Sequence, residues 1–366
     1  MIARRSLLAA TAGLGAAGAL APAAQGQTAV PALAGLNEEG RGRMVAAIEA
    51  AKREGSITYV EAVIAADTAA ELARGFKRHY GLPSSFNVSY TLANTGAIVT
   101  RLEQELSAGR LATDVVGLAA PSWVFARAAG GDVLPYASPE YPKYKRVFDL
   151  GMGRDGYFAF NGAYFFVPMW NAATLKFKGS SWADLLGAVP PGRINMGNAE
   201  TSLANLVTYM SVRKVMGDAF YARLAEMKPR IIQAGEMAHD RVMSGQDLFS
   251  LYGQATHVKH RNELGGDLRM MIPAEGLVLL PQCLFILAKA PHPNASKLFL
   301  DYMLSEAGQA ILMEREVLIS GRDGAGSPMP GYPLTLDALK VIPVDWASLT
   351  PDELARGRAE WIRTFK

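Results

Sequence analysis

The sequence predicts an α/β fold divided into two lobes. The chain has 366 residues, a length that suits about two domains with a core each. Short β-branched or apolar runs alternate with amphipathic helical patterns along most of it, as in a parallel sheet covered by helices. Two long apolar segments, 158–170 and 277–287, are the candidates for strands that cross between the lobes.

The composition is that of a globular protein. Hydrophobic residues make up 50% of the chain and charged residues 19%, which excludes intrinsic disorder. The formal net charge of +3 gives no strong basic field, so nucleic acid is not expected as a partner. The single cysteine, Cys283, excludes an internal disulfide and any multi-cysteine metal site, and its apolar neighbours predict a buried thiol.

Residues 1–26 have the pattern of an export signal. Arg4 and Arg5 are followed by Ser-Leu-Leu and by a stretch rich in alanine and glycine, which predicts a signal of the twin-arginine type. Cleavage is expected after Ala23 or near Gly26, and the mature protein is expected in the periplasm. A membrane anchor is the alternative, which the alanine, glycine and proline content of the stretch disfavours.

The first half of the mature chain alternates helices and strands. Apolar residues at helical spacing predict the first two helices, and Gly55 and Gly81 are expected to end them. β-Branched runs predict the strands between them. The expected elements are helices 37–54 and 67–80, helices that begin near Asn94 and at Pro121, and strands 56–60, 88–92 and 114–118.

The second half repeats this alternation after an irregular stretch over 135–156. That stretch is rich in proline and tyrosine and predicts an ordered loop region. The capping box from Thr350 to Glu353, with Pro351 at the first helical position, predicts a final helix. The other expected elements are the short helix 182–186, helices 203–216, 220–227 and 238–243, a helix after Pro293, and strands 193–196, 230–232 and 248–252.

Catalytic motifs are not visible in the sequence. A GxGxxG match over 13–18 lies inside the export signal with no strand before it, and an SxxK match at 211–214 lies inside a predicted helix without its companion motifs. His257 and His260 could share a helical face and a metal ion, but Lys259 and Arg261 beside them favour a solvated face. An enzyme is therefore not expected, and an exported metal-dependent enzyme is the remoter alternative.

Polar turns follow several of the predicted strands. In open α/β sheets ligands bind outside the carboxyl ends of the strands, where helix N-termini offer free N–H groups to a carboxylate or phosphate. The alternative is that Thr95, Ser122 and Ser202 are plain N-caps of their helices. The candidate ligand-binding residues are Glu61, Asn94, Thr95, Ser122, Trp170, Asn198, Thr201, Ser202 and Tyr252.

The run from Ala290 to Gln309 carries a resemblance to a known family. It reads Ala-Pro-His-Pro-Asn-Ala-Ser-Lys-Leu-Phe-Leu-Asp-Tyr-Met-Leu-Ser-Glu-Ala-Gly-Gln. It is similar to the Ala-Pro-x-Pro-x-Ala-x-x-Phe-x-x-Phe-x-x-Ser-x-x-Gly-Gln helix of periplasmic solute-binding proteins of ABC importers, in the type 2 group that contains ferric-iron and polyamine binders. Further similar stretches lie at 55–59, 106–116, 242–246 and 273–276, so the resemblance covers nearly all of residues 55–315.

The resemblance implies two lobes, each a mixed sheet flanked by helices, joined by crossing strands. It also implies a small-molecule solute held between the lobes, hinge closure around it, docking of a monomer on an ABC permease of the inner membrane, and no cofactor. The expected organisation is the signal 1–26, lobe 1 from 55–158, lobe 2 from 159–276, a return crossing with the rest of lobe 1 over 277–335, and a C-terminal helix packed across the lobes in 336–366.

One departure from this family bears on the solute. Ferric binders that the chain resembles carry adjacent tyrosines, and the matching positions here are Ala255 and Thr256, with Tyr252 as the nearest tyrosine. The sequence therefore favours a small anionic organic solute, and no metal ligands are assigned. The alternatives are iron(III) or a ferric chelate, and a polyamine-like cation that the carboxylates of Glu61, Glu200 or Glu275 would receive.

Overall fold

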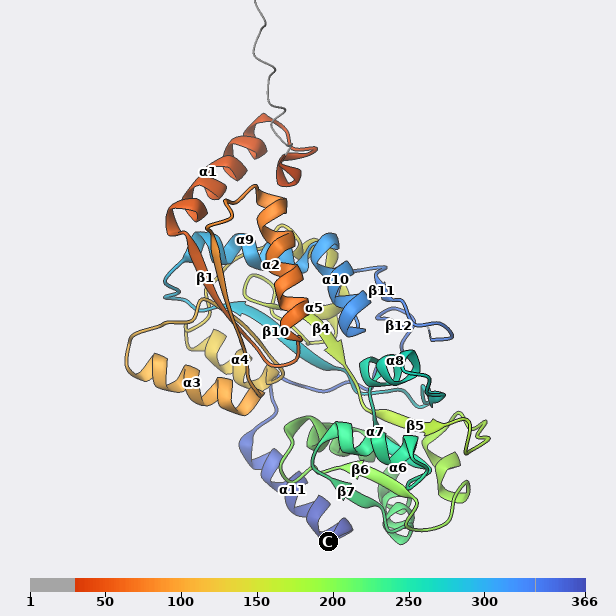
Figure 1. Cartoon of the computed structure of the whole chain (residues 1–366). Helices are drawn as coiled ribbons and strands as arrows, with labels where there is room; N and C mark the ends of the chain where they lie inside the picture. Colours follow the sequence, from red (N-terminus) through yellow and green to blue (C-terminus); the bar gives the residue numbers. More distant parts are fainter. Residues whose placement is uncertain (1–29, 333) are drawn as a thin grey trace, which may run out of the picture.

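The computed structural model describes residues 30–332 and 334–366, and it consists of two lobes (Figure 1). The expected export signal, 1–26, lies outside the described residues. Each lobe contains one five-stranded sheet, with the order β2-β1-β3-β10-β4 in lobe 1 and β7-β6-β8-β5-β9 in lobe 2. Within the described residues, no helix is both long enough and apolar enough to span a bilayer.

Lobe 1 is a sheet with helices on both faces. Strands β1 to β4 run parallel to one another, and β10 runs antiparallel between β3 and β4. Its strands are β1 (Ser56–Glu61), β2 (Asn87–Leu92), β3 (Val115–Leu118), β4 (Ala159–Tyr164) and β10 (Leu280–Ile286). Its helices are α1 (Glu38–Glu54), α2 (Ala66–Tyr80), α3 (Thr95–Ser107), α4 (Pro121–Ala129), α5 (Lys145–Asp149), α9 (Pro293–Leu304) and α10 (Glu306–Glu316).

The alternation of side chains along β1 divides the core of lobe 1 in two. Tyr59 points to the face covered by α2 and α9, where its ring centroid lies 5.1 Å from that of Phe299. Its neighbour Val60 joins a second cluster with Ile98 of α3 and Val124 of α4 on the other face. Because both faces of the sheet are covered, β3 and β10 are buried along their whole length, whereas no residue of the edge strand β2 is buried.

Lobe 2 has the same layered plan. Its strands are β5 (Val167–Asn171), β6 (Ile194–Gly197), β7 (Arg230–Ile232), β8 (Phe249–Gly253) and β9 (Leu268–Met270). Its helices are the 3₁₀ helix η3 (Trp182–Gly187), α6 (Leu203–Glu226), α7 (Gly235–Met243), α8 (Ala255–Glu263) and α11 (Pro351–Phe365). Gly217 interrupts α6 with φ 77° and ψ 171°, a conformation open to glycine, so the two helices expected over 203–216 and 220–227 are the halves of one bent element.

The long segment 158–170 forms two strands in different lobes. Tyr164 of β4 pairs with Leu280 in lobe 1, whereas Val167 of β5 pairs with Gly253 in lobe 2. The chain therefore crosses at Phe165 and Phe166, and β4 belongs to lobe 1 although the sequence placed the lobe boundary before it. The return strand is also shorter than expected, since β10 begins at Leu280.

These crossings make the carboxyl edges of the two sheets face each other. Parallel strands end at a common edge, which is the edge after β1 to β4 in lobe 1 and after β6, β7 and β8 in lobe 2. Phe165 and Phe166 connect the carboxyl end of β4 to Val167 of β5. Val167 pairs with Gly253, which is the carboxyl end of β8. Both lobes therefore present the turns after their strands to the same junction.

The C-terminal helix packs differently from the expectation. After the strand pair β11 (Gly326–Ser327) and β12 (Leu334–Thr335), the chain passes to lobe 2, where α11 packs along α6 rather than across both lobes (Figure 1). The capping box predicted at its start is confirmed, because Thr350 accepts from the Glu353 N–H (3.2 Å) and Glu353 accepts from the Thr350 N–H (2.9 Å).

Candidate functional site

The junction of the two carboxyl edges gathers most of the candidate residues. The turns after β1, β2 and β3 come from lobe 1, and those after β6, β7 and β8 come from lobe 2. The candidates that the fold brings to these turns are Glu61, Asn94, Thr95, Ser122, Asn198, Thr201, Ser202 and Tyr252.

Trp170 is not brought to this junction. It pairs with Phe249, the first residue of β8, so it lies at the end of the sheet opposite to Gly253. Its ring packs against Phe177 at 5.2 Å between centroids, and the side chain is 9% exposed. The reason is strand direction, because β5 runs antiparallel to β8 and carries its last residues away from the junction. Trp170 is a core residue of lobe 2.

Glu61 ends β1 and organises the edge of lobe 1 from inside. It is fully buried, and Gly117 of β3 leaves the space that its carboxylate fills. Its donors are the N–H groups of Ala62 (2.7 Å) and Val63 (3.1 Å), the side-chain amides of Asn161 (3.0 Å) and Gln282 (2.8 Å), and the Tyr59 hydroxyl. Burial raises the pKa of this carboxyl, and the hydrogen bonds oppose that rise. In this conformation Glu61 fixes neighbouring strands rather than facing solvent.

The two helix starts in lobe 1 differ in how they are capped. The Asn94 side chain accepts from the Ala97 N–H (2.9 Å) and is the N-cap of α3, so Thr95 is the first helical residue and not a cap. Helix α4 begins at Pro121 with no side-chain cap, and Ser122 is its second residue. The N-cap interpretation therefore does not apply to Thr95 or Ser122.

The turn from Asn198 to Ser202 connects β6 to α6 in lobe 2. The buried Asn198 side chain accepts from the Glu200 N–H (2.8 Å), and the main-chain carbonyl of Asn198 accepts from the Ser202 N–H (3.1 Å). Ser202 accepts from the Asn205 N–H (3.3 Å), which confirms it as the N-cap of α6. Thr201 is exposed at the tip of the turn.

Tyr252 lies between the starts of α7 and α8. Its ring centroid is 4.4 Å from that of Phe166 in the crossing, and burial raises the pKa of its hydroxyl, which keeps the phenol neutral. A Cβ placed on Gly235, the first residue of α7, would lie 2.8 Å from the Tyr252 ring and 3.5 Å from the His257 ring of α8. The two helix N-termini therefore lie side by side, and neither has a side-chain cap.

The sequence favoured a solvated face for His257 and His260, and the structure exposes His260 but packs His257 inside lobe 2. His257 packs against His239 of α7, with ring centroids 4.3 Å apart, whereas His260 lies near Lys259 and Glu314 on another side of α8. Burial is the main cause that lowers the pKa of His239 to about 3, and it also lowers the pKa of His257. His239 was missed because its approach to α8 depends on the fold. In the described ranges, no group of three or more His, Cys, Asp or Glu residues is arranged to hold a metal.

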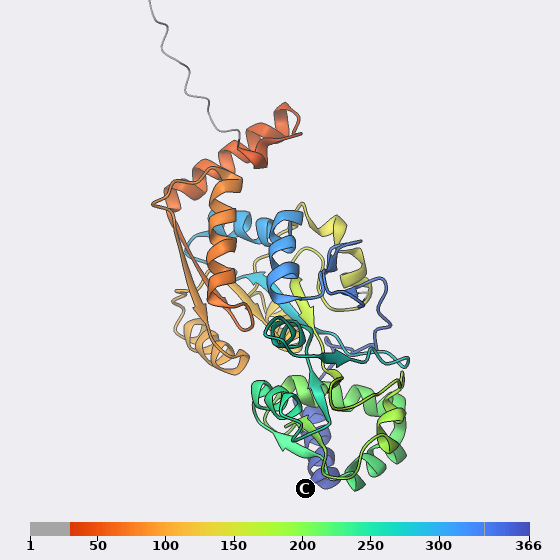
Figure 2. The same ribbon diagram turned by 45° about the vertical axis from the view of Figure 1, so that its right-hand side comes forward.

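Helix α8 also touches lobe 1, as Figures 1 and 2 both show. Its first residue, Ala255, is buried, and Thr256 donates to the carbonyl of Glu316 at the end of α10. Ala255 and Thr256 occupy the positions at which ferric binders of the resembled family carry tyrosines. Here Ala255 begins the helix and Thr256 makes a hydrogen bond between the lobes. Cys283 is fully buried in the lobe 1 sheet, which confirms the predicted buried thiol.

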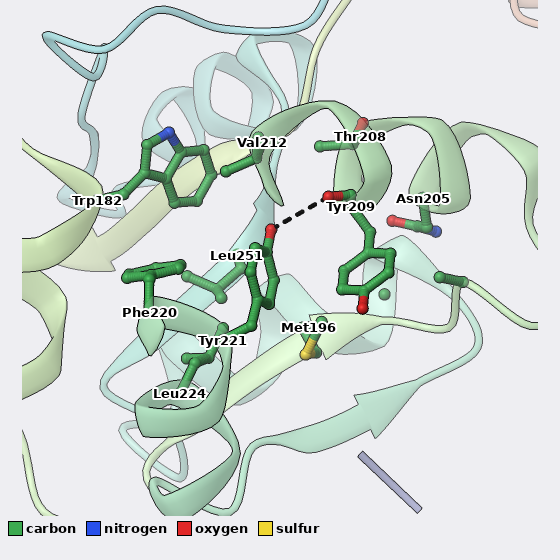
Figure 3. A pocket seen from close by; sticks show the side chains of 12 residues that line it. Trp182, Met196, Asn205, Thr208, Tyr209, Val212, Phe220, Tyr221, Leu224 and Leu251 are labelled. Atoms are coloured by element: carbon green, nitrogen blue, oxygen red, sulfur yellow. Dashed lines mark hydrogen bonds between the residues drawn. The ribbon is translucent and has the colours of Figure 1, made fainter. Parts of the chain in front are cut away.

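A small cavity lies inside lobe 2, between the two halves of α6 and the sheet (Figure 3). Trp182, Met196 and Leu251 line it, and Tyr221 donates a long hydrogen bond to the Tyr209 carbonyl beside it (3.5 Å). Its volume is about 40 Å³, whereas pockets for organic ligands are typically ~300–1,000 Å³. This cavity is too small for an organic solute.

Comparisons with known proteins agree with this geometry. The sequence pattern of the family described as bacterial extracellular solute-binding protein matches residues 58–315. Iron-bound HitA from Pseudomonas aeruginosa has a TM-score of 0.63 at 20% identity, over 85% of this chain and 98% of that one. The substrate-binding protein of an ABC transporter from Agrobacterium tumefaciens has a TM-score of 0.69 at 14% identity, over 85% and 94%.

A third solved structure widens the range of bound ligands. The binding protein AfuA from Actinobacillus pleuropneumoniae, with fructose-6-phosphate bound, has a TM-score of 0.64 at 18% identity, over 85% of this chain and 98% of that one. At these identities the likenesses establish the two-lobed fold and leave the ligand open. No curated protein sequence matches the chain.

Proposed function

The chain belongs to the family of bacterial extracellular solute-binding proteins, and from this premise we propose that it captures a small anionic organic solute between its two lobes. The protein then delivers that solute, chemically unchanged, to an ABC permease of the inner membrane. It acts as a monomer in the periplasm after export by a twin-arginine signal and removal of residues 1–26.

The observation that carries an anionic solute is the set of uncapped helix starts at the junction. Helices α4 from lobe 1 and α7 and α8 from lobe 2 begin there without a side-chain cap. The first N–H groups of a helix lack partners within the helix, and the aligned peptide dipoles place about half a positive charge there. A carboxylate or phosphate that contacts starts in both lobes would hold the lobes together.

The carboxylates considered for a polyamine already have partners. Glu61 is buried among its donors, and Glu200 is paired with Lys366, which follows the last residue of α11. Glu275 accepts from the Ser181 hydroxyl and from the Trp182 N–H (3.3 Å). An amine would have to displace these bonds, whereas an anion uses N–H groups that the fold leaves available. Glu236 is exposed in the first turn of α7, and its negative charge would repel an anion there. The test below therefore includes Glu236→Gln, which removes this charge.

A ferric chelate is the second candidate. Two solved structures of the same fold hold iron, namely iron-bound HitA and a Trichodesmium protein in complex with iron and citrate, the latter with a TM-score of 0.64 at 14% identity. Because Ala255 and Thr256 offer no phenolates, bare Fe(III) would lack its strong oxygen ligands here. A chelate such as ferric citrate brings its own oxygen ligands and carries negative charge, so it suits the same helix starts.

A thermal-shift screen of the mature protein tests this proposal. Ligand at about 100 times its dissociation constant stabilises a folded protein by roughly 2.7 kcal/mol. We expect stabilisation by one or more of citrate, aromatic carboxylates, fructose 6-phosphate and ferric citrate, with a larger effect in Glu236→Gln. Stabilisation by spermidine alone, lost rather than raised in Glu236→Gln, would overturn the anionic assignment in favour of a cation.

A further inference from the structure

The C-terminal helix reaches the turn of the candidate site through one residue, Glu200. The Arg358 Nε donates to the main-chain carbonyl of Glu200 (2.8 Å), and the Lys366 ammonium pairs with its carboxylate. Both partners belong to the C-terminal end of the chain, more than a hundred and fifty positions from Glu200. The turn from 198 to 202 is therefore held from outside as well as by its own hydrogen bonds.

The C-terminal helix is itself rigidly seated. Trp361 is fully buried, and a Cβ on Gly357 would lie 2.4 Å from the sulfur of Met210, so α11 and α6 approach closely. Arg213 of α6 pairs with Glu360 of α11 (3.2 Å). Helix α6, against which α11 packs, has Ser202 as its N-cap. It therefore starts directly after the 198–202 turn, which α11 contacts.

The bond from Arg358 fixes the orientation of the peptide between Glu200 and Thr201. In a trans peptide the carbonyl and the following N–H point in opposite directions. Because the Glu200 carbonyl points to α11, the Thr201 N–H points away from α11. The Glu200 and Ser202 N–H groups are used by Asn198, and no partner is found for the Thr201 N–H among the described residues.

The ion pair with Lys366 neutralises the negative charge of Glu200. The Glu200 carboxylate would otherwise stand unpaired at a turn assigned here to an anion. The pair is half exposed, with 45% and 35% of the two side chains accessible, so screening makes its contribution to folding small. Its main effect is therefore on the field at the turn rather than on stability.

We propose that α11 positions the 198–202 turn for binding, with Arg358 aiming the Thr201 N–H and Lys366 neutralising Glu200. This inference rests on the proposed function, since it assigns roles toward the anionic solute. Arg358 and Lys366 are positioning residues and do not contact the solute. The chain offers a matched control in Arg363, an exposed arginine on the same helix that lies outside these contacts with the turn.

Hydrogen exchange measured by mass spectrometry tests, without any solute, whether Arg358 holds the 198–202 turn. In the mature protein, Arg358→Ala should make the peptide covering 198–205 exchange about 2- to 12-fold faster, the factor for one lost hydrogen bond. Arg358→Lys should restore part of the protection, and Arg363→Ala should exchange as the unaltered protein does. Unchanged exchange of this peptide in Arg358→Ala would overturn the positioning role.

Calorimetric titration with citrate and with fructose 6-phosphate tests the charge effect. Lys366→Met should weaken the anion that binds by about 5- to 10-fold, and Glu200→Gln with Lys366→Met should recover that loss, because the unpaired carboxylate is gone. Equal affinities for all three proteins would overturn the role of Lys366 while leaving the proposed function intact. If neither anion binds the unaltered protein, the proposed function fails. The hydrogen-exchange data then decide by themselves whether Arg358 holds the 198–202 turn.

Discussion

The hydroxyl of Thr256, in lobe 2, donates a hydrogen bond to the main-chain carbonyl of Glu316, in lobe 1. Lys259, one turn further along α8, donates to the carbonyl of Glu314 (2.9 Å). These carbonyls belong to the last turn of α10, where backbone acceptors lack helical partners and the dipole is negative. The C-terminus of a helix in one lobe is thus capped by side chains of the other lobe.

Removing this cap should let the lobes separate. In Thr256→Val with Lys259→Ala, spin labels placed at the exposed positions Thr100 of α3 and Met237 of α7 should report longer and broader distances than in the parent protein. Cys283 is fully buried and does not interfere with labelling. Lys214→Ala, an exposed lysine on α6, is the control. Identical distance distributions in all three proteins would show that this contact does not hold the lobes.

Acid should destabilise the protein through His239. Its pKa is lowered to about 3 in the folded state, mainly by burial, while an unfolded histidine titrates near ~6.5. The folded state favours the neutral ring, so this stability is complete above about pH 6.5 and is lost as the pH falls. Groups that face the ring include His257, Tyr252 and Arg261.

The size of this effect follows from the two pKa values. Between pH 7.5 and pH 5.0 His239 should account for a loss of about 2 kcal/mol in unfolding free energy. Urea denaturation at both pH values should therefore show a smaller decline in His239→Phe than in the parent protein. An equal decline in the two proteins would mean that His239 is accessible to protons in the folded state.

Gly117→Ala should destabilise lobe 1. The added Cβ would lie 1.9 Å from Oε2 of Glu61, and that carboxylate has no free space because its donors surround it. We expect a loss of about 1–3 kcal/mol in urea denaturation, the usual cost of overpacking. Gly42→Ala is the opposite control, because Gly42 lies inside α1 with nothing within 4 Å, and alanine there should stabilise the protein by up to about 1 kcal/mol.

Substitutions at Ser122 and Ser202 should separate effects on solute binding from effects on folding stability. Ser202 caps α6, so Ser202→Ala should lower the unfolding free energy by about 1 kcal/mol. Ser122 caps nothing, so Ser122→Ala should leave the melting temperature unchanged and weaken the anion found in the screen by roughly tenfold. Unaltered affinity in Ser122→Ala would show that the Ser122 hydroxyl does not bind the solute.

Local patterns in the sequence predicted most elements because their causes are local. The apolar spacing of α2, the glycine after α1 and the capping box of α11 act within a few residues, and all three are found as expected. The polar turns after β2, β3 and β6 were also predicted, since a parallel sheet places the carboxyl ends of its strands at one edge. What each turn residue bonds to was not, which is why Thr95 was taken for a possible N-cap in place of Asn94.

Contacts between distant segments were decided by the tertiary structure alone. The segment 158–170 is apolar throughout, so only pairing with Leu280 and with Gly253 reveals that it changes lobes at Phe165 and Phe166. The same pairing sends Trp170 to the far end of lobe 2. By itself the sequence determined most of the α/β elements and the polar turns after β2, β3 and β6. The register of the sheets and the seating of α11 decided which turns meet, because these depend on packing between residues that no local pattern links.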